Sequence, residues 1–262
     1  MKFKLLKMKK IITLLALSIV LFSCSKDDEP TQQPLVKVID KIEVKTTNPN
    51  TFPVTSIYEL RFEYNLNKEI SKISYYYSNG DLNASFAYTY YNNVPVSAIY
   101  DNPESGDPVS VVNYGYNNDV FNSVNYIYYY TSPEYFTYNS STKQYSNAGG
   151  NNNFIVNATN DIEVKNRSGY EYAFSFDTSK KGPLYNVINK KWIPVLWYIS
   201  GLEGINYNVT TTHPVMSVFD DNLAQTNPFT NTYDTDGFVV KSVFTTDNGV
   251  VSHEIMYTYK SI

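Results

Sequence analysis

A tyrosine repeat with a spacing of 26 residues constrains the fold of this chain more than any other feature of its sequence. Pairs of the form aromatic-x-aromatic end at Tyr64, Tyr90 and Tyr116, and each is followed by a polar turn and then by branched aliphatic residues. Tyr233 and Tyr259 show the same spacing near the end of the chain. Alternate residues of a strand share one face, so each pair predicts a strand with both rings on one side. The repeat therefore predicts successive β-hairpins in an antiparallel meander.

Turn residues and composition favour the same all-β fold. Asn79-Gly80, Asp236-Gly237 and Asn248-Gly249 supply the residues that adopt positive φ in tight hairpin turns. The chain holds 26 Tyr and 14 Phe, and many expected strands are aromatic on both faces. We therefore expect a curved, partly single-layer sheet rather than a closed two-layer sandwich. Tyrosine rings would cover its backbone while their hydroxyls stay solvated.

One segment interrupts the hairpin pattern. Residues 180–205 are richer in apolar side chains and contain both tryptophans, Trp192 and Trp197. The breakers Gly182-Pro183 and Pro194 predict a loop, a short helix and a second loop. We interpret this insert as a plug that covers one end or one face of the sheet.

The N-terminus predicts export. Five lysines precede an apolar run from Ile11 to Phe22, which would span about 18 Å as a helix, less than the roughly 30 Å of a bilayer core. This pattern is typical of a signal peptide. The run ends at Leu21-Phe22-Ser23-Cys24, which resembles a lipobox although Phe22 is larger than is usual there. The predicted segments are a signal peptide at 1–23, an acidic tether at 24–34 and a β-hairpin domain at 35–262.

Cys24 is the predicted lipid anchor. It is the only cysteine of the chain, so no internal disulfide can form. Bacterial lipoproteins resemble one another in carrying two or three acyl chains, which bind a membrane firmly. The tether Ser25–Pro34 resembles the acidic stretch of surface-displayed lipoproteins, which predicts a surface-exposed protein on the outer membrane. The alternative is an ordinary signal peptide that happens to contain a cysteine.

Charge excludes one class of partner. Removal of the signal peptide and its lysines leaves a mature chain with a net charge of about −9. An acidic surface repels phosphate backbones, so nucleic-acid binding is not expected.

Several of these features together resemble one lipoprotein family. The unit Tyr233-Asp234-Thr235-Asp236-Gly237-Phe238 is similar to the YD-type hairpins of secreted repeat proteins. With the lipobox, the acidic tether and the proline-containing insert, the chain resembles a DUF4595-like family, a domain of unknown function, over about Phe62–Tyr259. The resemblance implies a meandering, porin-like sheet and no catalytic residues.

No constellation for catalysis or metal binding stands out. The two histidines, His213 and His253, are expected at solvated or edge positions, and no nucleophile motif accompanies them. The acidic residues Asp101, Glu104 and Asp107 are the best candidates for a glycosidase pair, but their segment has the composition of a hairpin loop. We therefore predict a protein that is not an enzyme and uses no cofactor.

A weak metal candidate lies at Asp234 and Asp236, whose spacing matches the start of a calcium loop. The glutamate expected downstream in such a loop is missing, so we favour a hairpin turn over a metal site.

Binding of a glycan or peptide is the preferred function. Trp192, Trp197 and Tyr198 form the candidate ligand platform, because exposed aromatic rings suit sugar rings and extended peptides. The competing interpretation of the tryptophans is that they anchor the insert in the core. Alternatives for the whole protein are a structural surface protein without a discrete ligand and, less favoured, a glycan hydrolase. A pore is disfavoured by the lipobox and the acidic, aromatic faces.

Overall fold

The structure is a computed structural model that describes residues 35–51, 55–106, 108–127, 132–147, 149–150, 152–167, 169–192 and 210–262. The chain divides into the units Met1–Leu35 and Val36–Ile262, and the β-sheet described below belongs to the second unit. The signal peptide, Cys24 and the acidic tether lie outside the described residues. No helix of the described part is both long and apolar enough to cross a membrane.

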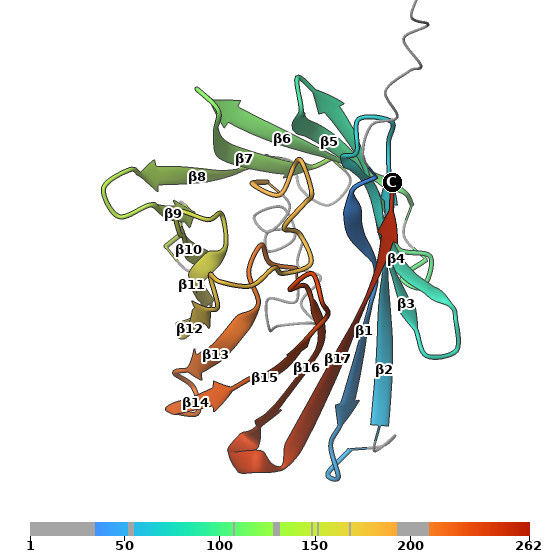
Figure 1. The fold of residues 1–262 in the computed structure, drawn as a ribbon. Helices are drawn as coiled ribbons and strands as arrows, with labels where there is room; N and C mark the ends of the chain where they lie inside the picture. Colours follow the sequence, from blue (N-terminus) through green and yellow to red (C-terminus); the bar gives the residue numbers. More distant parts are fainter. Residues whose placement is uncertain are drawn as a thin grey trace, which may run out of the picture. The chain divides into compact units, whose positions relative to one another are not determined.

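Val36–Ile262 forms a 17-stranded antiparallel sheet (Figure 1). The strands are β1 (Lys37–Thr47), β2 (Thr55–Tyr64), β3 (Ile70–Tyr77), β4 (Leu82–Tyr91), β5 (Val94–Asp101), β6 (Ser110–Asn117), β7 (Val120–Tyr126), β8 (Glu134–Asn139), β9 (Gln144–Asn147), β10 (Asn152–Val156), β11 (Ile162–Arg167), β12 (Tyr170–Phe176), β13 (Val215–Asp220), β14 (Gln225–Pro228), β15 (Thr230–Tyr233), β16 (Val239–Thr246) and β17 (Val251–Ser261). A short 3-10 turn, η1 (Asp247–Gly249), joins the last two strands.

The strands follow chain order around a nearly closed ring. Each strand from β1 to β13 pairs with the next, and β17 pairs back onto β1. β14 and β15 are separated only by Phe229, and they pair with β13 on one side and β16 on the other. The pairing is shortest between β7 and β8, where only Ser123↔Tyr135 and Val124↔Glu134 are paired. The predicted all-β meander with a curved single sheet is confirmed.

Alternation separates an apolar inside from an outer face that is charged on β1, β2, β16 and β17. In β2, Leu60 and Phe62 are buried, and Glu59 and Arg61, which alternate with them, face outward. The inward side chains of β1 to β11, β16 and β17 join one apolar cluster. On the outer face, Lys41 Nζ lies 3.0 Å from Glu59 Oε2, and further charge pairs continue onto the neighbouring strands. Such exposed pairs contribute at most about 1 kcal/mol each, so the buried side chains dominate stability.

The repeat tyrosines link neighbouring strands through side-chain hydrogen bonds. Each hydroxyl donates to a backbone carbonyl of the preceding strand: Tyr64 to Ile39 (2.7 Å), Tyr90 to Ile70 (2.6 Å), Tyr116 to Pro95 (2.7 Å) and Tyr259 to Val239 (2.8 Å). The expectation that tyrosine hydroxyls stay solvated is wrong for these four, because their rings point into the barrel and bury the hydroxyl. A register shift directly precedes Tyr64, Tyr90, Tyr116 and Tyr233. Such bulges increase local twist, which helps a sheet to curl.

The hairpin turns use the predicted residues. Gly80, Gly237 and Gly249 all adopt positive φ. A second turn type has an Asx side chain that accepts backbone N–H bonds from residues two and four positions later. It occurs at Asn65, Asn157 and Asp234. The last residue of this turn points inward each time: Glu69, Asp161 and Phe238 are 1%, 0% and 3% exposed.

The insert forms a plug, defined here as Lys181–Trp192 and Thr210–Pro214. Leu184, Val187 and Trp192 join the apolar cluster of the barrel, and Figure 1 shows Lys181–Trp192 inside the ring of strands. Gly182 N donates to Thr212 O at 2.8 Å, which joins the two halves of the plug. The described part of the expected helix consists of turns, and residues 193–205 lie outside the described residues. The plug itself is as predicted, but no helix occurs in its described part.

Candidate functional site

Trp192 lines a small pocket at one end of the short strands β8 to β11. The pocket has a volume of about 190 Å³ and is bounded by two hairpin turns and the plug. Its lining residues are Tyr138, Lys143, Tyr145, Val156, Asn157, Ala158, Asn160, Lys191 and Trp192. Of the predicted ligand platform, Trp192 lies here, whereas Trp197 and Tyr198 lie outside the described residues.

The pocket wall is a rigid stack of aromatic rings. Tyr138 and Tyr145 lie with ring centroids 4.6 Å apart, and Tyr145 stacks on Phe154 at 4.8 Å. The Trp192 ring meets the edge of Tyr116 at 4.8 Å, so it is fixed from the barrel side. Trp192 is only 6% exposed, which means that it is both a core anchor and a pocket wall. The expectation of an exposed Trp192 ring is therefore wrong, the interpretation as a core anchor holds for it, and only a small part of the ring faces the pocket.

The charged groups in the described lining of the pocket are two lysines. Lys143 and Lys191 are exposed, and within the described residues neither makes an ion pair. Lys191 Nζ lies 4.5 Å from the centroid of the Trp192 ring, a cation–π contact. Among the described residues no carboxylate lines the pocket, although the whole chain has a net charge of −4. The local charge is thus opposite to that of the chain.

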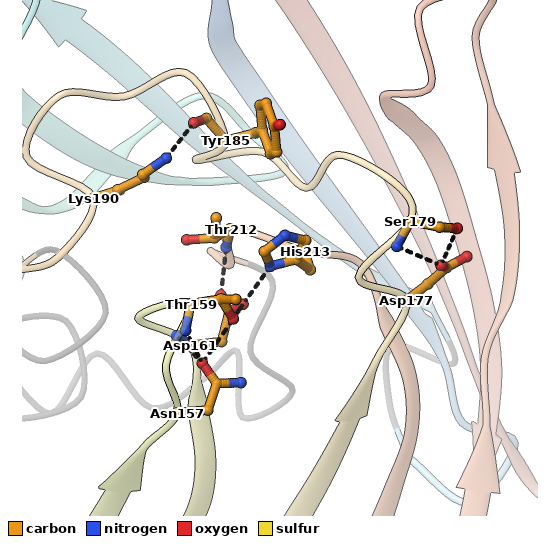
Figure 2. Close-up of polar contacts among 9 residues, drawn as sticks. All are labelled: Asn157, Thr159, Asp161, Asp177, Ser179, Tyr185, Lys190, Thr212 and His213. Atoms are coloured by element: carbon orange, nitrogen blue, oxygen red, sulfur yellow. Dashed lines mark hydrogen bonds and ion pairs between the residues drawn. The ribbon is translucent and has the colours of Figure 1, made fainter. Parts of the chain in front are cut away.

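The β10–β11 turn contributes residues to the pocket and also binds the plug. Asn157 and Asn160 contribute to the pocket lining, and Asp161 at the end of the same turn points the other way, into the interior. Asp161 Oδ2 lies 2.9 Å from His213 Nδ1, and Asp161 Oδ1 accepts a hydrogen bond from the Thr212 N–H (Figure 2). Thr159 Oγ1 adds a third hydrogen bond to Asp161 at 3.1 Å. One buried carboxylate therefore ties the plug to the turn.

Burial has the largest effect on the pKa of the Asp161 carboxyl. Loss of water around Asp161 raises the pKa of its carboxyl, and the bonds from His213, Thr212 and Thr159 only partly oppose that effect. A group whose ionised form is disfavoured by burial depends strongly on each of its donors. The link is therefore sensitive to the loss of any partner.

The Asp161–His213 pair corresponds to two members of a catalytic triad. Within the described residues the only hydrogen bond of the His213 ring is the one to Asp161, so no hydroxyl nucleophile is seen against its other nitrogen. The nearest aromatic ring, Tyr185, meets His213 edge-on with centroids 6.1 Å apart. Within the described residues the pair links the plug to the β10–β11 turn.

Both histidines depart from the sequence-based expectation. His213 and His253 are 7% and 6% exposed, so the prediction of solvated or edge positions is wrong. His253 lies between Thr46 and Thr246 and stacks on Phe244 at 4.5 Å. Packing of the plug decides the burial of His213, which nothing adjacent in the sequence indicates. His253 alternates with the buried Val251 and Ile255 on β17, so the local strand pattern already predicts an inward side chain.

The other candidate residues lie apart from the pocket. Asp234 Oδ1 accepts bonds from the backbone of Asp236 and Phe238, and its Oδ2 pairs with Lys37. These contacts form a hairpin turn, as preferred over a calcium loop. In the part of the chain that the structure describes, no three His, Cys, Asp or Glu side chains cluster as metal ligands would.

The acidic cluster of the sequence is a loop. Glu104 is exposed on the β5–β6 turn and accepts a hydrogen bond from Tyr77, and Asp101 is half-buried at the end of β5. Asp107 lies outside the described residues.

Comparison with known proteins shows a shared fold. Neither a protein-family model nor a curated protein matches the sequence. Among solved structures, the chain is similar to a porin-like protein from Bacteroides uniformis, with 13% identity, a TM-score of 0.51 and coverage of 85% of this chain and 96% of that one. A porin-like protein from Bacteroides vulgatus matches with 10% identity and a TM-score of 0.38, over 86% of this chain and 99% of the other. The first likeness establishes a porin-like β architecture and nothing more specific.

Proposed function

We propose that this chain is a lipid-anchored protein of the cell envelope and that its β domain is a non-catalytic binding module. The Trp192 pocket carries this proposal, because it combines aromatic walls with convergent hydrogen-bond donors. Its ligand would be a small group of a glycan or peptide. Membership of the DUF4595-like lipoprotein family is part of the same proposal.

The proposed anchor is the lipid on Cys24, followed by the acidic tether, on the outer membrane and facing outward. A tether of this composition remains extended and leaves the domain free to meet a ligand. Replacement of Cys24 by Ser should move the protein from the membrane fraction to the soluble fraction. Mass spectrometry of the mature N-terminus checks the modification directly. A free Cys24 thiol on a soluble mature chain would contradict the anchor.

The outer face of the barrel argues against a membrane-spanning pore. A transmembrane barrel presents an apolar band about 25 Å tall to the lipid. In this chain the outward residues of β1 and β2 include Lys41, Glu43, Glu59 and Arg61 in mid-strand, joined as charge pairs. The interior is filled by the apolar cluster, to which the plug contributes Leu184 and Trp192. The packed interior and the charged outer faces of β1, β2, β16 and β17 fit a domain that stands on the membrane.

A glycan array and a pull-down with envelope extract test the binding role. Tyr138→Ala removes an aromatic wall at a side chain that is 37% exposed, so folding should be kept while binding falls. Tyr135→Ala is the matched control, because Tyr135 lies on the same strand, faces outward and is 59% exposed. Equal binding by both variants and the native chain would remove the pocket from the proposal. Absence of any ligand would favour a structural surface protein instead.

A further inference from the structure

We propose that the Trp192 pocket takes a single sugar ring that carries one negatively charged group, a carboxylate or a sulfate. This inference rests on the proposed binding function and names its ligand class. The pocket is compact: its volume of about 190 Å³ lies below the roughly 300–1,000 Å³ of typical ligand sites. It therefore suits one ring rather than a long chain.

The aromatic walls favour a ring with apolar faces and polar edges. Trp192, Tyr138 and Tyr145 line the pocket, and the Tyr138–Tyr145 pair is held by the stacking of Tyr145 on Phe154. A sugar ring stacks its C–H face on such walls and directs its hydroxyls outward. Because the rings are already fixed by core contacts, little side-chain freedom is lost on binding.

The donors favour an anion. Lys143 and Lys191 bring two positive charges to the pocket, and no carboxylate of the described lining neutralises them. The Asn157 Oδ1 is occupied by the N–H groups of Thr159 and Asp161 (Figure 2). That arrangement fixes the side-chain orientation and leaves the Asn157 amide nitrogen as a third donor. Two ammonium groups and one amide match the acceptor oxygens of a carboxylate or sulfate.

The pairing of the strands disfavours an extended peptide as the occupant. Peptides commonly bind by adding a strand to a free sheet edge. The strands that bound this pocket, β8 to β11, are each paired on both sides, although β7–β8 contributes only two residue pairs. An acidic peptide would have to bind through side chains alone.

Isothermal titration of the full mature chain with D-glucuronic acid, glucose 6-sulfate and glucose tests the inference. We expect the charged sugars to bind about tenfold more tightly than glucose, since two partly exposed charge pairs together contribute about 1.4 kcal/mol. The preferred charged sugar distinguishes carboxylate from sulfate. The double variant Lys143→Gln, Lys191→Gln should bind all three sugars equally. Lys45→Gln removes the same charge from an exposed site on β1 and should keep the preference.

Several outcomes would overturn the inference, and they separate it from the proposed function. Glucose binding as tight as that of the charged sugars, but lost in Tyr138→Ala, would refute the charge preference and support the binding role. A preference that survives the double lysine variant would also refute it. Tighter binding of a short oligo-aspartate peptide would replace the sugar with an acidic peptide. No binding of any probe would count against both the inference and the glycan form of the function.

Discussion

The ring of strands has two unlike arcs. The long-strand arc, β16 and β17 with β1 to β7, contains strands of 7 to 11 residues and every repeat tyrosine that bonds to a neighbouring strand. The short-strand arc, β8 to β15, has strands of four to seven residues. The pocket and the carboxylate that holds the plug both lie in the short-strand arc. The long-strand arc is made of regular hairpins joined by local turns, whereas the short-strand arc carries the pocket. The plug contacts both arcs, because Asn186 and Asn189 bond to β1, β3 and β4 of the long-strand arc.

The strongest test of this difference is Asp161→Ala. It leaves the buried His213 ring and the Thr212 N–H without their acceptor, whereas Thr159 can still donate to Asn157 Oδ1 at 2.8 Å, so we expect a loss of about 3 kcal/mol in the free energy of unfolding. Denaturant unfolding followed by circular dichroism measures it. Asp221→Ala is the control, since Asp221 is exposed in a turn of the same arc. If both variants cost the same small amount, the plug is not held by this carboxylate.

Gly182→Ala should loosen the plug itself. An added Cβ would lie 2.6 Å from the Thr211 carbonyl oxygen and 2.9 Å from His213 backbone atoms, which cannot yield as a side chain would. We expect a loss of about 1–3 kcal/mol, as for other overpacked sites, and faster proteolysis within the plug. Ile188→Ala, at a plug side chain that is 54% exposed, should change stability little. Unchanged proteolysis of Gly182→Ala would show that the two halves of the plug are not tightly apposed.

In the long-strand arc, hydroxyl removal should separate two kinds of tyrosine. Tyr116→Phe removes one bond to a backbone carbonyl and should cost about 1 kcal/mol, whereas Tyr90→Phe also removes the acceptor of the buried Asn189 amide and should cost more. Tyr88 is 7% exposed and its buried hydroxyl has no hydrogen-bond partner among the described residues, so Tyr88→Phe should be neutral or stabilising. Thermal unfolding of the three single variants gives the comparison. Equal effects at all three positions would mean that the inter-hairpin bonds contribute nothing.

The last prediction is a pH dependence in the long-strand arc. Burial lowers the pKa of His253 to about 4, from an ordinary value near 6.5. The unfolded chain therefore binds a proton between these values that the native chain does not. Stability is full above about pH 6.5 and falls as the pH decreases toward 4. His253→Gln should be less stable at pH 7 but show a shallower loss across that range, measured by urea unfolding. If the unfolding free energies of the native protein and of His253→Gln fall equally with decreasing pH, the pH dependence does not come from His253.

The local sequence was sufficient for the long-strand arc. The spacing of Tyr64, Tyr90 and Tyr116, together with turns such as Asn79-Gly80, predicted hairpins that the structure contains. A strand period and a positive-φ turn are properties of a few adjacent residues, so they are visible without a fold. The same reasoning also identified the insert and Trp192, because breakers and apolar density are local features too.

The pocket and its link to the plug were decided by tertiary structure. The pocket joins residues from Tyr138 to Trp192, and Asp161 and His213 are 52 positions apart, so no spacing rule connects them. One local clue existed: Asn157-Ala158-Thr159-Asn160-Asp161 forms the same Asx turn as Asp234–Phe238, whose last residue points inward. Which partner meets that inward carboxylate depends on how the barrel closes and where the plug lies. Sequence determines the strands and turns because their causes are local; the site arises only where distant segments pack together.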